Sequence, residues 1–190
     1  MIDLAANSCR WLYIDCFPWM KGCFQKNHAP QVIEGSFMNL GTVHPNMAKD
    51  TIDYWAALCD GERVYQISIG MLNYSVQEIV EFSRSISRER PGIFVITSSE
   101  KGLAIAEAGD VSFSQSSSIS NEHFVDSAGA GAAVSAKYLD HILRGERLER
   151  GALAAKLTEH GTAQCRVTGA LPASEYIEWV TELDRNLPNA

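Results

Sequence analysis

The chain has 190 residues, of which 46% are apolar, so it is long enough to bury the core of one domain. Its 16 basic and 23 acidic side chains give a net charge of −7, which excludes a broad basic surface for nucleic acid or for an anionic membrane. No segment has the length of a membrane span or the pattern of a secretion signal, so we expect a cytoplasmic protein. The five cysteines form no Cys-x-x-Cys pair, and with the scattered histidines they predict reduced thiols and no zinc site.

The first part of the chain alternates strand-like and helix-like segments. Residues 11–16 form an apolar, β-prone run that Pro18 ends, and residues 31–40 form a second β-prone run. Apolar residues at helical spacing then predict a helix over 45–58, and alternation predicts a strand over 64–69.

The clearest predicted helix begins after Ser75. Ser75 and Glu78 form a capping-box pattern, apolar and small residues line one face of the following turns, and Pro91 ends the segment. Residues 92–97 are a continuous apolar run, which is typical of a strand buried on both faces.

A hairpin and then helices complete the predicted domain, which we take as residues 1–190. Two β-prone segments, 103–107 and 111–115, flank an Ala-Gly-Asp turn and predict a hairpin. The serine-rich stretch 114–120 predicts a loop. The rest is predicted to be helical, over about 131–143, 148–161 and 174–183. Strand–helix alternation predicts an α/β fold of three layers, α/β/α, with a mainly parallel sheet. Ligands of such sheets lie at the carboxyl ends of the strands.

The segment that points most directly to chemistry is the glycine-rich loop before the helix at 131. Residues 125–134 read Val-Asp-Ser-Ala-Gly-Ala-Gly-Ala-Ala-Val. Small residues before a helix let backbone N–H groups approach an anion, and the helix dipole adds partial positive charge. No Gly-Lys-Ser/Thr follows, which excludes a Walker A loop. From the residues alone, anion binding and close packing are equally good interpretations.

This loop resembles the second signature of the ribokinase-like (PfkB) carbohydrate kinases, Asp-Thr-x-Gly-Ala-Gly-Asp-x-Phe. Asp126 stands at the first Asp, Ser127 at the Thr, and Gly129-Ala130-Gly131 at Gly-Ala-Gly. Ala132 occupies the place of the second Asp, and Val134 that of the Phe.

Weaker matches extend the resemblance from near residue 10 to the end of the chain. Residues 95–102 are similar to the family's Val-x-Thr-x-Gly-x-x-Gly strand and turn, and residues 73–76 lie where the family carries Asn-x-x-Glu, with Val76 at the Glu. The resemblance implies nucleotide-binding roles for Asn73, Thr97, Ser99 and Gly102, although Ser99 replaces a glycine where positive φ is expected. The family's N-terminal segment, with its Gly-Gly sugar-binding signature and β-lid, has no counterpart here.

The resemblance also assigns roles around the loop. It implies an anion hole formed by Gly129, Ala130, Gly131 and Ala132, with ATP as the ligand, Mg²⁺ as its companion and a monovalent cation near Asp126. A simpler alternative for Asp126 is an Asx-type turn or helix cap. In the family the second signature Asp is the general base, and Ala132 cannot accept a proton. Val76 offers no oxygen to Mg²⁺. Glu78 is a substitute metal-associated carboxylate, but its capping-box role is the simpler account.

We therefore predict a sugar-kinase homologue that binds ATP or ADP and whose phosphoryl transfer to a sugar hydroxyl is impaired or lost. Two alternatives stay open: an active carbohydrate kinase that uses another base or a partner chain, and a structural remnant or half of a split kinase. The expected partners are a nucleotide and a small sugar, with a second copy or a partner chain in place of the lid. The aromatic-rich residues 11–24 are the candidate surface for that contact.

Overall fold

The computed structural model describes residues 9–16, 32–57, 61–117 and 123–166. These residues form one six-stranded sheet in the order β1-β2-β3-β4-β5-β6. The strands are β1 Cys9–Asp15, β2 Val32–Thr42, β3 Glu62–Ser68, β4 Ile93–Ser98, β5 Gly102–Glu107 and β6 Asp110–Gln115. Strands β1 to β4 run parallel, β5 pairs antiparallel with β4, and β6 pairs antiparallel with β5 at the edge.

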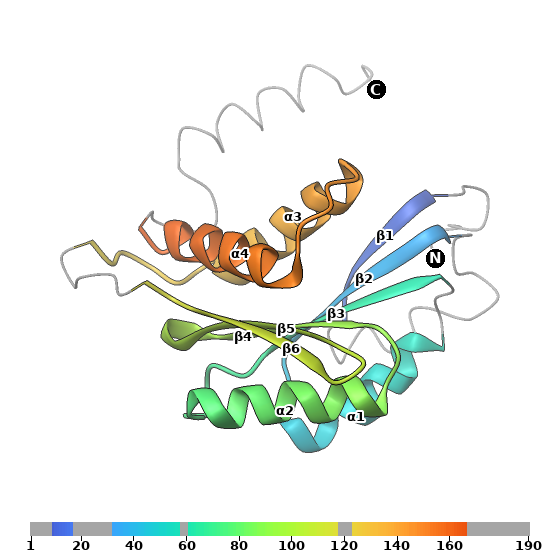
Figure 1. The fold of residues 1–190 in the computed structure, drawn as a ribbon, viewed down its shortest axis with the longest axis horizontal. Helices are drawn as coiled ribbons and strands as arrows, with labels where there is room; N and C mark the ends of the chain where they lie inside the picture. The colour runs from blue at the N-terminus through green and yellow to red at the C-terminus, as the bar shows by residue number, and fades with distance from the viewer. Residues whose placement is uncertain (1–8, 17–31, 58–60, 118–122, 167–190) are drawn as a thin grey trace, which may run out of the picture.

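Four helices cover the two faces of the sheet. They are α1 Pro45–Ala56, α2 Val76–Glu89, α3 Ala130–Leu143 and α4 Arg150–Gln164. Figure 1 shows α1 and α2 on one face and α3 and α4 on the other. The predicted three-layer α/β/α architecture with a mainly parallel sheet is therefore confirmed. Among the described residues, none of the helices is long and apolar enough to span a membrane.

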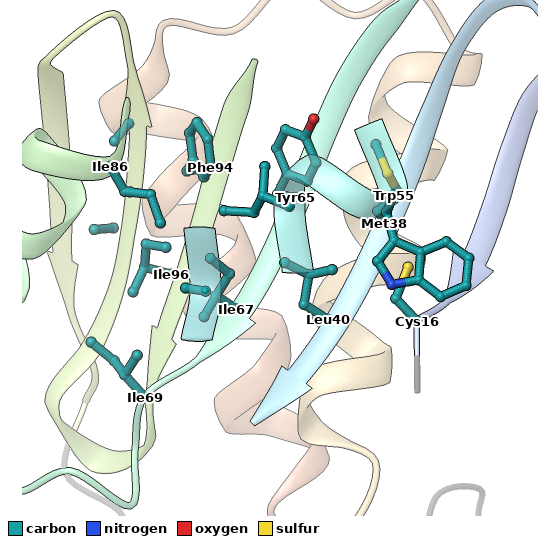
Figure 2. Close-up of a cluster of buried hydrophobic side chains, with 14 of the residues drawn as sticks. Cys16, Met38, Leu40, Trp55, Tyr65, Ile67, Ile69, Ile86, Phe94 and Ile96 are labelled. Atoms are coloured by element: carbon teal, nitrogen blue, oxygen red, sulfur yellow. The ribbon is translucent and has the colours of Figure 1, made fainter. Parts of the chain in front are cut away.

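Each face of the sheet has its own apolar core. Under α1 and α2, the fully buried Trp55 and Ile86 lie among side chains of β2, β3 and β4 (Figure 2). On the opposite face, Val134 of α3 and Leu157 of α4 pack against Phe37 of β2. Each such large apolar side chain contributes about 1.5–3 kcal/mol when it leaves water. The alternation of β2 and β3 between the two cores therefore holds the sheet between its helix layers.

The start of α2 agrees with its sequence prediction. The Ser75 backbone N–H donates to Glu78 Oε2 at 2.7 Å, and the Glu78 N–H donates to Ser75 Oγ at 3.3 Å. These reciprocal bonds satisfy N–H groups that a helix start otherwise leaves without acceptors. The predicted capping box is confirmed.

Two of our predictions overlap at Ser114 and Gln115, a strand over 111–115 and a loop over 114–120. Both residues belong to β6 and pair with Leu103 and Gly102 of β5, so the strand prediction is confirmed there, and the loop begins later than we predicted. Residues 118–120 of that loop and the predicted helix over 174–183 lie outside the described residues.

The turn between β5 and β6 offers a small stabilising substitution. Ala108 has φ 50° and Gly109 has φ 88°, so both central residues of this two-residue turn are left-handed. Asparagine adopts this conformation more readily than alanine, and Asn-Gly is a favoured pair in such turns. We expect Ala108→Asn to raise the free energy of unfolding by about 1 kcal/mol, measured by urea denaturation. An unchanged or lowered denaturation midpoint would contradict the left-handed assignment.

Glu62, the first residue of β3, should make the stability of the fold depend on pH. Partial burial, and secondarily the negative charge of Glu107, raise the pKa of Glu62 above its ordinary value. As pH rises from about 4.5 through that raised pKa, Glu62 ionises at a greater cost in the folded chain than in the unfolded chain, so stability falls. We expect Glu62→Gln to gain stability relative to wild type over that interval, as measured by denaturation at several pH values. A constant difference between the two proteins at all pH values would contradict this.

Candidate functional site

The glycine-rich loop leads into α3 directly above β3. Gln66, a nearly fully buried residue of β3, donates from Nε2 to the Gly131 carbonyl at 2.9 Å. Ser135, one turn further along α3, donates from Oγ to Gln66 Oε1 at 2.8 Å. A buried amide of the sheet therefore fixes the height and rotation of the first turn of α3.

The backbone of the loop is arranged by local hydrogen bonds. Gly129 precedes the first helical residue of α3 and has φ 79°, a left-handed conformation that glycine adopts without strain. The Ala128 N–H donates to Asp126 Oδ1 at 2.9 Å, and the Ala130 N–H donates to the Ser127 carbonyl at 3.2 Å. Helical bonding begins with the Ala133 N–H and the Gly129 carbonyl at 2.8 Å.

Two N–H groups of this turn remain available. Gly131 and Ala132 are the second and third residues of α3, positions whose N–H groups have no acceptor inside a helix. Neither has a backbone acceptor elsewhere in the described part of the chain, and both residues are exposed. The N-terminus of a 14-residue helix adds partial positive charge at the same point. This arrangement suits a phosphate or another anion.

The side chains of the loop contribute less than its backbone. Asp126 forms the Asx turn that we considered as the simpler alternative for it, and only its Oδ1 takes part in that turn. Ala132 presents a methyl group to solvent and offers no proton acceptor. The chemistry at this turn therefore rests on main-chain N–H groups.

The other residues predicted to contact nucleotide lie around the carboxyl ends of β3 and β4. Asn73 Oδ1 accepts from Lys101 Nζ at 3.1 Å, and the Thr97 carbonyl accepts from the Ile69 N–H at 2.9 Å. Ser99 has φ 43° and Gly102 has φ 124°. The positive φ expected at position 99 is therefore present, with a serine in it.

Glu78 is engaged by its own helix start. Its carboxylate accepts from both the hydroxyl and the backbone N–H of Ser75, and these bonds lower the pKa of Glu78. Across the described ranges, no three His, Cys, Asp or Glu side chains gather closely enough to hold a metal ion. A Mg²⁺ ion here would accordingly take most of its ligands from nucleotide phosphates and water.

Two residues that position the turn, Gln66 and Ser135, are absent from the predicted site. The sequence places Gln66 in an alternating strand and Ser135 in a helix, without a functional role. The sequence does contain a signal for Gln66, because a side-chain amide in an otherwise buried strand requires a specific hydrogen-bond partner. That partner is the first turn of α3.

No family profile matches the chain, and no curated protein matches its sequence. Among solved structures, adenosine kinase from Sinorhizobium meliloti aligns with a TM-score of 0.61 at 13% identity, over 92% of this chain and 54% of the kinase. Anopheles gambiae adenosine kinase aligns with a TM-score of 0.55 at 16% identity, over 84% and 51%. Aminoimidazole riboside kinase from Salmonella enterica aligns with a TM-score of 0.56 at 15% identity, over 90% and 62%.

These similarities establish the class of fold. The chain has a ribokinase-like α/β fold, the fold of sugar and nucleoside kinases. It spans 54% and 51% of the two adenosine kinases, about half the length of each.

Proposed function

We propose that this chain is a PfkB-type kinase homologue that binds ATP or ADP at the first turn of α3. One observation supports this above others: the N–H groups of Gly131 and Ala132 have no acceptor in the described part of the chain and lie at the start of a helix in a ribokinase-like fold. Phosphate oxygens are the natural acceptors for such groups.

The neighbouring residues fit a nucleotide at the same edge of the sheet. Asn73 follows β3, Thr97 lies near the end of β4, Ser99 follows β4 and Gly102 begins β5. We assign these four residues to the nucleotide side of the site. Asp126 Oδ2 has no hydrogen-bond partner among the described residues and is our candidate for a monovalent cation. Mg²⁺ would accompany the phosphates and neutralise charge during transfer.

Phosphoryl transfer to a sugar hydroxyl is expected to be slow. A positioned base contributes about 10²–10⁴-fold to such a step, which corresponds to roughly 3–5 kcal/mol at about 1.4 kcal/mol per tenfold. Position 132 supplies no base. Binding depends on the backbone and is retained, because replacing a side chain does not remove an N–H group.

Isothermal titration with ATP and with ADP, each with and without Mg²⁺, tests the binding claim. We expect saturable binding at millimolar concentrations or below, and an absence of heat at millimolar nucleotide would contradict it. A coupled ADP-release assay with D-ribose, D-fructose and adenosine then measures transfer.

Three outcomes separate the interpretations. Binding with very slow turnover supports the proposal, and efficient turnover supports an active kinase. No binding supports a structural remnant or half of a split kinase. The active alternative has one specific observation in its favour, the carboxylate of Asp15, which Tyr13 and Asn39 hold through one oxygen.

A further inference from the structure

A row of polar side chains crosses three strands beneath the start of α3. In the register of the sheet, Asp15 of β1 is directly opposite Asn39 of β2, and Asn39 is directly opposite Gln66 of β3. Side chains of directly opposite residues point to the same face. Gln66 contacts α3, so all three face the α3 side.

Asp15 is held in place through one of its two oxygens. Tyr13 Oη and Asn39 Nδ2 both donate to Asp15 Oδ1, each at 2.8 Å. Asn39 is fixed in turn, because its Oδ1 accepts from the Gly41 N–H at 3.1 Å. Asp15 Oδ2 has no hydrogen-bond partner among the described residues, and the side chain is partly exposed. An oriented carboxylate with one free oxygen is the form that a general base takes.

The carboxylate lies close to the proposed phosphate site. Neighbouring strands are about 4.8 Å apart, so the Cα atoms of Asp15 and Gln66 are about 10 Å apart across β2. Gly131 lies against Gln66, since its carbonyl accepts from Gln66 Nε2 at 2.9 Å. Ser135 bonds Gln66 Oε1 at 2.8 Å, so the first two turns of α3 lie over this row.

A phosphoryl group held about 2.9 Å from the N–H groups of α3 and a hydroxyl about 2.7 Å from Asp15 Oδ2 would lie on the same face of the sheet. Asn39 lies between Asp15 and Gln66 in the register, and its amide is already bonded to Asp15, Tyr13 and Gly41.

We propose that Asp15, and no residue of the glycine-rich loop, is the proton acceptor for the slow phosphoryl transfer that this chain retains. The acceptor alcohol forms a bond from its oxygen to the γ-phosphorus as the bond from that phosphorus to the β–γ bridging oxygen breaks. The hydroxyl proton moves to Asp15 Oδ2, and the nucleoside diphosphate leaves with the electron pair of the broken bond. This inference rests on the proposed nucleotide site at α3.

Asp15→Asn tests the assignment with little change in shape. The variant keeps an oxygen that accepts from Tyr13 and Asn39, but the amide that replaces Oδ2 cannot take a proton. With MgATP and either D-ribose, D-fructose, adenosine or water as acceptor, we expect ADP release with the best acceptor to fall about 10²-fold or more. The dissociation constant for ATP should stay within about twofold.

A rescue variant separates catalysis from structure. In an Asp15→Asn chain, Ala132→Asp places a carboxylate at the start of α3. We expect this double variant to release ADP at least tenfold faster than Asp15→Asn alone. Asp140→Asn, on the exposed side of α3 where Asp140 pairs with Lys137 and Arg144, removes the same charge and should not change the rate.

The outcomes distinguish this inference from the proposed function. If ATP does not bind to the wild-type chain, both are overturned. If ATP binds and Asp15→Asn turns over as fast as wild type, only the role of Asp15 is overturned. Binding of ATP with no ADP release from wild type for any of the four acceptors also overturns that role and leaves the nucleotide site intact.

Discussion

Gly102→Ala is expected to lower the free energy of unfolding by about 3 kcal/mol or more, the largest effect of any single methyl group that we predict. Gly102 has φ 124° and ψ −150°, a region that is essentially restricted to glycine. A Cβ atom at this position would lie 2.1 Å from the Ser114 carbonyl oxygen, so the backbone of β6 would have to move. Urea or thermal denaturation measures the loss.

Gly145→Ala is the matched control for this substitution. Gly145 also has a positive φ, 66°, but an added Cβ would meet nothing within 4 Å. Gly145→Ala should therefore lower the free energy of unfolding only by the conformational strain, about 1–2 kcal/mol. Equal losses in the two variants would show that the close approach between Gly102 and Ser114 contributes little.

Gly131→Glu is expected to weaken ATP binding by tenfold to a hundredfold without unfolding the protein. The new carboxylate would lie beside the N–H groups that we assign to phosphate, and like charges at such distances repel by roughly 1–4 kcal/mol. The fold tolerates the side chain, because a Cβ at Gly131 would be 3.5 Å from Gln66 Nε2, an ordinary contact. Glutamate also favours the first turn of a helix.

The chain contains a control at the same position of another helix. Gly151 is the second residue of α4, as Gly131 is of α3, and an added Cβ there would meet nothing within 4 Å. Gly151→Glu introduces the same charge and the same helix-start residue away from the site. We expect its dissociation constant for ATP, measured by titration calorimetry, to match wild type. Equal weakening in both variants would contradict a local effect at α3.

Most of the fold followed from sequence pattern because the strands and helices differ clearly in hydrophobic period. The continuous apolar run at 92–97 became β4, between strands on both sides, and Ser75 with Glu78 correctly marked the start of α2. The start of the following loop was less predictable, since Ser114 and Gln115 have weak strand preference and are held in β6 by pairing with β5. Pairing between strands is a tertiary effect that local preference does not encode.

The candidate site was predictable only where it depends on local sequence. The glycine-rich loop could be recognised because its residues are contiguous. Gly129 has a positive φ, which explains a glycine at that position. The row formed by Asp15, Asn39 and Gln66 could not, because its members come from three strands and meet only through the register of the sheet. Glu78 was a candidate for a metal role, but its capping of α2 is enough to explain a glutamate at this position.

Nucleotide binding at α3 and proton transfer to Asp15 depend on different parts of the structure. Anion binding requires only that α3 begin where it does, which Gln66 ensures through the Gly131 carbonyl. Proton transfer requires a carboxylate across the sheet, and Asp15 is oriented for it by Tyr13 and Asn39. An alanine at position 132 retains the N–H group for binding but removes the base of the loop, so the slow transfer that we propose depends on Asp15 of β1.

The central claim is that the main-chain N–H groups of Gly131 and Ala132 bind nucleotide phosphate, and amide NMR tests it most directly. In ¹H–¹⁵N spectra of the full chain titrated with ATP, we predict that the resonances of these two residues shift progressively, with a common dissociation constant. ADP should give the same shifts, whereas adenosine, which has no phosphate, should not. Saturable binding of ATP that leaves both resonances unmoved would contradict the account.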